Sequence, residues 1–64
     1  MIGIMKIDET IDHIEFFVSR VEELEKLKGG RYNGHVVGHG SIVLVKETKE
    51  VFAYDAENDE WVSL

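Results

Sequence analysis

The chain has 64 residues, no cysteine and a formal net charge of −6, from 13 acidic and 7 basic side chains. This length suffices for one domain, residues 1–64, and the lack of cysteine excludes disulfides and thiolate metal sites. The negative charge disfavours direct binding to nucleic acid or to an anionic membrane. Because neither a signal peptide nor a run of roughly 18 apolar residues is present, we expect a cytoplasmic protein.

A short strand is predicted at residues 1–7, which are rich in isoleucine. Residues 8–28 predict one long amphipathic helix, because apolar side chains recur every three or four positions. Asp8 suits the N-cap, and Gly29-Gly30 would end the helix. Such a helix is about 31 Å long, whereas a compact domain of this size is about 28 Å across. We therefore expect the end of the helix to overhang and to favour packing against a second copy.

The rest of the chain predicts turns and strands. Residues 29–41 hold five of the six glycines, with a turn at Asn33-Gly34 and a short strand at 36–37. Three antiparallel strands are predicted at 42–45, 51–54 and 61–64. The predicted fold class is α+β, with one long amphipathic helix packed on a three- to four-stranded antiparallel sheet in the order (β)αβββ.

Acidic side chains are segregated along the chain. Residues 8–28 carry seven acids and three bases, and residues 50–64 carry five acids and no base. At about 100° per residue, five acids of the predicted helix share one arc opposite the apolar stripe. They would place one charge per roughly 4.5 Å, close to the 3.4 Å or so of a DNA strand. The candidate partner-binding residues are Asp8, Asp12, Glu15, Glu22 and Glu23 on the helix, and Asp55, Glu57, Asp59 and Glu60 near the C-terminus.

Four apolar residues are candidates for an interface between copies of the chain. Phe16 would lie on the polar side of the predicted helix, where an exposed aromatic ring is a candidate contact. Leu24 and Leu27 would lie on its overhanging end, and Trp61 on the last hairpin. Since a domain of this length has a small core of its own, a homodimer is predicted.

Three histidines raise the alternative of a metal-dependent enzyme. His35 and His39 are four residues apart, a spacing that two zinc ligands can use on a helix. The glycines around them argue against a helix, and no third ligand is specified. In Gly38-His39-Gly40-Ser41, a serine lies close to a histidine in sequence, but no acid is specified to orient the histidine. We therefore predict no metal, no cofactor and no catalytic residue.

Residues 51–64 resemble the outer hairpin of a kelch repeat, and also a hairpin of one type of immunity domain. The similar features are Tyr54-Asp55, Asn58, Trp61 and Leu64. A kelch propeller needs several blades, and this chain has room for one at most. The resemblance therefore implies a local hairpin, with Trp61 packed over its turn, and no function.

The predicted function is that of a small acidic inhibitor, which occupies the basic, nucleic-acid-binding surface of another protein. In size, charge and charge segregation the chain resembles, as a class, the small acidic host-takeover proteins of phages, some of which mimic DNA. Two alternatives remain open: an antitoxin- or immunity-like protein that binds one cognate enzyme, and a structural dimerisation module.

Overall fold

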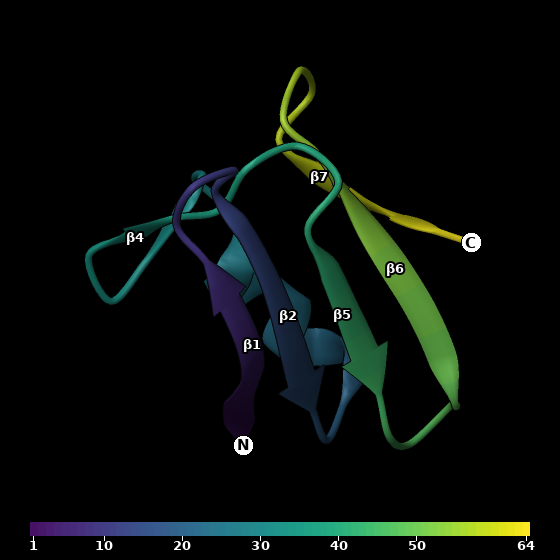
Figure 1. Cartoon of the computed structure of the whole chain (residues 1–64). Helices are drawn as coiled ribbons and strands as arrows, with labels where there is room; N and C mark the ends of the chain where they lie inside the picture. The colour runs from purple at the N-terminus through teal and green to yellow at the C-terminus, as the bar shows by residue number, and fades with distance from the viewer.

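The computed structural model describes residues 1–64 and consists mainly of β-strands (Figure 1). A single short 3-10 helix, η1, follows the second strand, and no helix has the length and apolar composition needed to cross a membrane. The elements in chain order are β1 (Ile2–Asp8), β2 (His13–Val18), η1 (Val21–Leu27), β3 (Arg31–Tyr32), β4 (His35–Val36), β5 (Ile42–Val45), β6 (Glu50–Asp55) and β7 (Glu60–Ser63).

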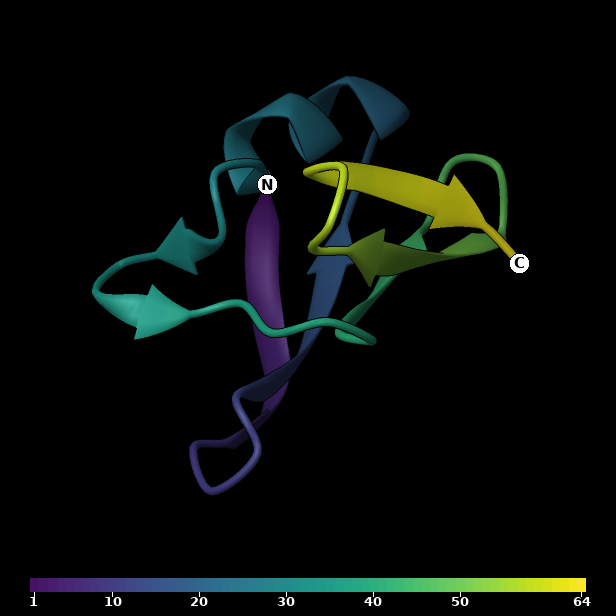
Figure 2. The same cartoon turned by 90° about the horizontal axis from the view of Figure 1, so that it is seen from above.

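Five strands form one sheet in the order β1-β2-β5-β6-β7, and β3 pairs with β4 in a separate two-stranded ribbon. Neighbouring strands of the large sheet are antiparallel except β2 and β5, which are parallel. Parallel strands need a long crossover connection. Here the crossover consists of η1, which lies against one face of the sheet, and the ribbon, which projects beyond the β1 side (Figure 2).

The predicted helix over residues 8–28 is wrong, and with it the α+β fold class. Asp8 ends β1, Asp12 has a left-handed backbone (φ 53°) in the turn that follows, and His13 begins β2. Along β2, buried side chains alternate with half-buried ones, which is the period of a strand. Only Val21–Leu27 coil, and they form a 3-10 helix with no overhanging end.

The predicted strands at 1–7, 42–45, 51–54 and 61–64 correspond to β1, β5, β6 and β7. The Asn33-Gly34 turn is confirmed between β3 and β4, where both residues have positive φ. The sheet has five strands rather than three or four, because β2, predicted as helix, joins β1 to β5.

The core lies between the large sheet, η1 and the chain that crosses back to β5. Phe16 is fully buried at its centre, with its ring 5.4 Å from that of Tyr32 and 6.1 Å from that of Trp61. Both contacts are edge-to-face, an arrangement that aromatic rings favour. The nine buried hydrophobic residues are Ile14, Phe16, Val18, Leu24, Leu27, Val37, Val43, Val45 and Tyr54.

The burial of Phe16, Leu24 and Leu27 corrects the reasoning behind the predicted interface. All three were placed on exposed parts of a helix, but they are buried within their own chain. Trp61 is half-buried, with its ring 5.0 Å from that of Tyr54. The homodimer remains a prediction, but these side chains no longer support it.

Candidate functional site

A cavity of about 140 Å³ lies between the β1–β2 turn and the β3–β4 ribbon. Three carboxylates, three apolar side chains and one imidazole line the cavity: Asp8, Glu9 and Asp12; Ile7, Ile14 and Val36; and His35. Ile14 is buried in the core, whereas Glu9 and Asp12 are exposed. The cavity therefore combines an apolar floor with an acidic rim.

The backbone of Asp12 is held in place by the chain that follows β4. Its carbonyl oxygen accepts a hydrogen bond from the Gly38 N–H (2.7 Å) and one from the hydroxyl of Ser41 (3.4 Å). The Ser41 hydroxyl is fully buried and also accepts the Ile14 N–H (3.2 Å). A Cβ atom added to Gly38 would lie 2.6 Å from the Asp12 carbonyl oxygen, so only glycine allows this close approach.

The carboxylates at the cavity have few partners within the protein. Asp8 Oδ1 accepts the backbone N–H of Thr10 (3.1 Å), and Glu9 Oε2 lies 3.7 Å from His35 Nδ1. No lysine or arginine forms an ion pair with Asp8, Glu9 or Asp12. A positive charge from another molecule would therefore not need to displace a lysine or arginine of the chain.

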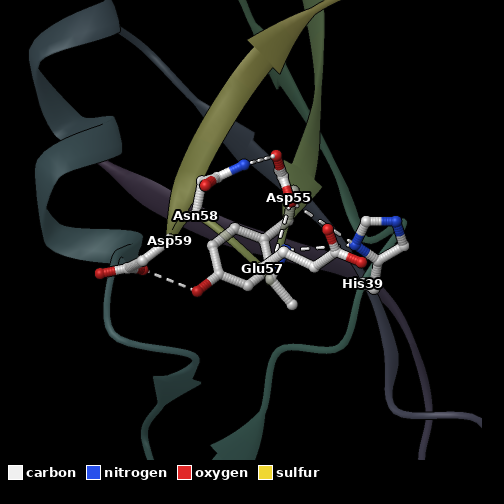
Figure 3. A network of polar contacts seen from close by, with 7 residues as sticks. His39, Asp55, Glu57, Asn58 and Asp59 are labelled. Carbon is white, nitrogen blue, oxygen red and sulfur yellow. Dashed lines mark hydrogen bonds and ion pairs between the residues drawn. The ribbon is translucent and has the colours of Figure 1, made fainter.

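The β6–β7 turn contains the second predicted acidic group (Figure 3). Asp55 accepts the Asn58 side-chain amide (2.8 Å) and the Glu57 N–H (3.0 Å), which together close the turn. The hydrogen bond from Asn58 lowers the pKa of Asp55. Glu57 and Glu60 are exposed, and their carboxylates have no hydrogen bond or ion pair.

Asp59 joins the β6–β7 turn to the corner after η1. Its Oδ1 accepts the Tyr54 hydroxyl (2.7 Å) and the Gly29 N–H (2.7 Å). The bond from Tyr54 lowers the pKa of Asp59, and the same bond, with burial, raises the pKa of Tyr54 to about 12. Asp55 and Asp59 thus stabilise the fold, whereas the side chains of Glu57 and Glu60 are free to bind.

The five acids predicted to share one helical face do not lie on one helix. Asp8 and Asp12 lie at the cavity, whereas Glu15 lies on β2, 3.1 Å from His13 Nε2. Glu22 and Glu23 lie in the first turn of η1. Glu23 binds the N-terminal ammonium of Met1, which lowers the pKa of this carboxyl. The predicted regular row of charges is therefore wrong.

The sequence-based prediction included Asp8 and Asp12, which line the cavity, but it did not include Glu9 or His35. On a helix, Glu9 would have lain outside the acidic arc. The stretch from Asp8 to Asp12 also separates two runs rich in isoleucine and phenylalanine, which is the pattern of a hairpin turn. That signal could have placed Asp8, Glu9 and Asp12 together at one end of a sheet.

Each histidine contacts a different carboxylate, and His13 lies 3.1 Å from Glu15. His35 contacts Glu9, while His39 Nδ1 accepts the Ala56 N–H (3.2 Å) and lies 4.0 Å from Asp55 Oδ1. No group of three histidine, aspartate or glutamate side chains is arranged to hold a metal ion. No family model, curated protein or solved structure matches the chain.

Proposed function

We propose that this protein binds a basic protein partner by charge complementarity and does not catalyse a reaction. The main support for the proposal is that few acidic side chains form ion pairs with basic side chains of the same chain. Of thirteen acidic residues, only Glu25 forms an ion pair with a lysine or arginine, namely Lys28 at 3.5 Å. Apart from the carboxylates of Glu23, Asp55 and Asp59, which accept hydrogen bonds within the chain, most of the negative charge is therefore available to another molecule.

Unpaired surface carboxylates attract a basic protein and increase the rate of the encounter. They are accessible to a partner, and no ion pair with a lysine or arginine has to break when it binds. Glu9 and Asp12 supply such charge at the cavity, and Glu57 and Glu60 at the β6–β7 turn. Two exposed acidic regions could thus contact the partner.

The partner that we propose is a nucleic-acid-binding protein, and binding would inhibit it by covering its phosphate-binding surface. The support is the charge of the chain, because such surfaces are rich in lysine and arginine. The mechanism no longer includes a helix that mimics the spacing of phosphates. We also propose that the complex forms in the cytoplasm. The support is that the chain has no cysteine, as suits a reducing compartment.

Affinity capture from a cell lysate, followed by mass spectrometry, tests the proposal. The tagged protein should retain a basic protein at about 50 mM salt and lose most of it at about 500 mM, because salt screens exposed charges. If no basic protein is enriched at the lower salt concentration, the proposal is wrong.

Two matched double variants identify the contacting surface. Glu9→Gln/Asp12→Asn and Glu57→Gln/Glu60→Gln remove the same charge from the cavity and from the β6–β7 turn. We expect the first to reduce capture more, because its carboxylates border a cavity. Equal retention by both variants and the unmodified protein would show that these carboxylates do not bind the partner.

A further inference from the structure

We propose that the cavity between the β1–β2 turn and the β3–β4 ribbon binds one arginine side chain of the partner. This inference rests on the proposed function and identifies the group that is recognised. The cavity volume, about 140 Å³, is below the roughly 300 Å³ at which pockets for drug-sized ligands begin. It therefore suits a single side chain rather than a whole small molecule.

The lining matches a side chain with an apolar stem and a cationic head. Ile14, which is 1% exposed, forms the floor, and the exposed side chains of Ile7 and Val36 flank it. Such surfaces pack against the methylene groups of lysine or arginine, while the charged head stays near water. The head would then lie beside the carboxylates of the rim.

The arrangement of the carboxylates favours arginine over lysine. Asp8, Glu9 and Asp12 line the cavity from the end of β1 and from the turn that follows, and none pairs with a lysine or arginine of the chain. A guanidinium presents five N–H donors in a planar fork and can bind more than one carboxylate at once. An ammonium group is a compact, strongly hydrated charge that gains less from several spread acceptors.

The cavity is also formed before any ligand arrives. The Gly38 N–H and the Ser41 hydroxyl both donate to the Asp12 carbonyl, which fixes the backbone of this wall of the cavity. A site that is already ordered binds more tightly, since less conformational freedom is lost on binding. The fixed wall distinguishes this cavity from Glu57 and Glu60, which lie on an open turn.

Titration of the isotope-labelled protein with N-acetyl-arginine amide, followed by NMR, tests the inference. The amide signals of Asp12, Ile14 and His35 should shift together and saturate. N-acetyl-lysine amide should bind more weakly, and the citrulline analogue, which has the same shape but no charge, should not bind. Shifts that do not saturate, or an equal response to citrulline, would overturn the inference.

Variants of the rim provide the second part of the test. Asp12→Asn and Glu9→Gln should each weaken arginine binding by roughly three- to ten-fold, the range expected for one partly exposed charged contact. Asparagine tolerates the left-handed backbone at position 12, so the turn should be retained. Glu60→Gln, which removes the same charge elsewhere, should have no effect. A loss as large for Glu60→Gln would overturn the inference.

The two proposals can fail separately. If a basic partner is captured but the arginine derivative does not shift the cavity signals, the cavity assignment is wrong and the proposed function stands. If the arginine derivative saturates the cavity but no basic protein is captured, arginine recognition stands and the proposed function is wrong.

Discussion

Single carboxylates of this chain have two distinct uses. Glu23, Asp55 and Asp59 accept hydrogen bonds within the protein, and those bonds lower the pKa of each of them. Glu9 and Asp12 at the cavity contact no lysine or arginine, and we propose that they bind the partner. The sequence does not separate these uses, because an aspartate that closes a turn and one that faces solvent have the same local signature.

Tyr54→Phe tests the bond that joins β6 to the corner after η1. The substitution removes the hydroxyl that Asp59 accepts at 2.7 Å, while the buried ring remains. We expect the free energy of unfolding to fall by about 1–2 kcal/mol, the range for a hydrogen bond to a partly exposed charged group. Urea denaturation followed by Trp61 fluorescence measures it, and an unchanged midpoint would show that the bond contributes nothing.

The lowered pKa values of Asp55 and Asp59 predict a loss of stability in acid. A carboxyl whose pKa is lower in the folded state contributes stability above its unfolded pKa of about 4, and loses it as the pH falls through the folded value. The urea midpoint should therefore be constant near pH 7 and should fall below about pH 4. Asp59→Asn should flatten this decrease, and an unchanged slope in that variant would contradict the assignment.

At the scale of elements, β2 shows where sequence reasoning succeeded and where it failed. Ile11, Ile14, Val18 and Val21 fit the period of a helix, whereas Ile14, Phe16 and Val18 fit that of a strand. These residues adopt the strand pattern, because β2 pairs with β1 on one side and with β5 on the other. β5 is separated from β2 by more than twenty residues, so a pattern read locally could not reveal that pairing. The strands that follow β5 were predicted because each is joined to the next by a short turn.

The neighbours Phe16 and Phe17 provide a direct test of that choice. On β2 the first side chain is fully buried and the second only half-buried. Phe16→Ala should reduce the free energy of unfolding by about 3–5 kcal/mol, and Phe17→Ala by about 1 kcal/mol. Chemical denaturation of the two variants measures the difference. A larger loss for Phe17→Ala would contradict the burial pattern of the strand.

β1 is an edge strand, and two features oppose its pairing with another chain. The register with β2 shifts between Ile4 and Lys6, and Lys6 is exposed between the exposed residues Met5 and Ile7. Bulges and lysines are common means by which edge strands avoid pairing. Lys6→Val should therefore increase self-association, measured by light scattering at equal concentration. Lys46→Val, which removes the same charge from a turn, is the control, and equal behaviour of the two variants would contradict this role.

At the scale of the whole molecule, the charge of the chain and its acidic regions were evident from sequence, but their arrangement was not. Asp8 and Asp12 were predicted to bind a partner, and they lie together at the cavity. Glu9 and His35 were not assigned there, because a contact between them requires the β3–β4 ribbon to lie against the β1–β2 turn. Contacts between distant segments of the chain thus determine which residues line the cavity, and amino-acid composition does not reveal such contacts.

The acidic turn between β1 and β2 is part of a hairpin that packs against the chain after β4. Nuclear Overhauser contacts in the labelled protein test it most directly. We predict cross-strand contacts between Ile7 and Ile14 and between Ile2 and Val18, and a contact between Asp12 and Gly38. Continuous contacts between successive amides from residue 8 to residue 28, with no cross-strand contacts, would instead establish the helix and contradict this account.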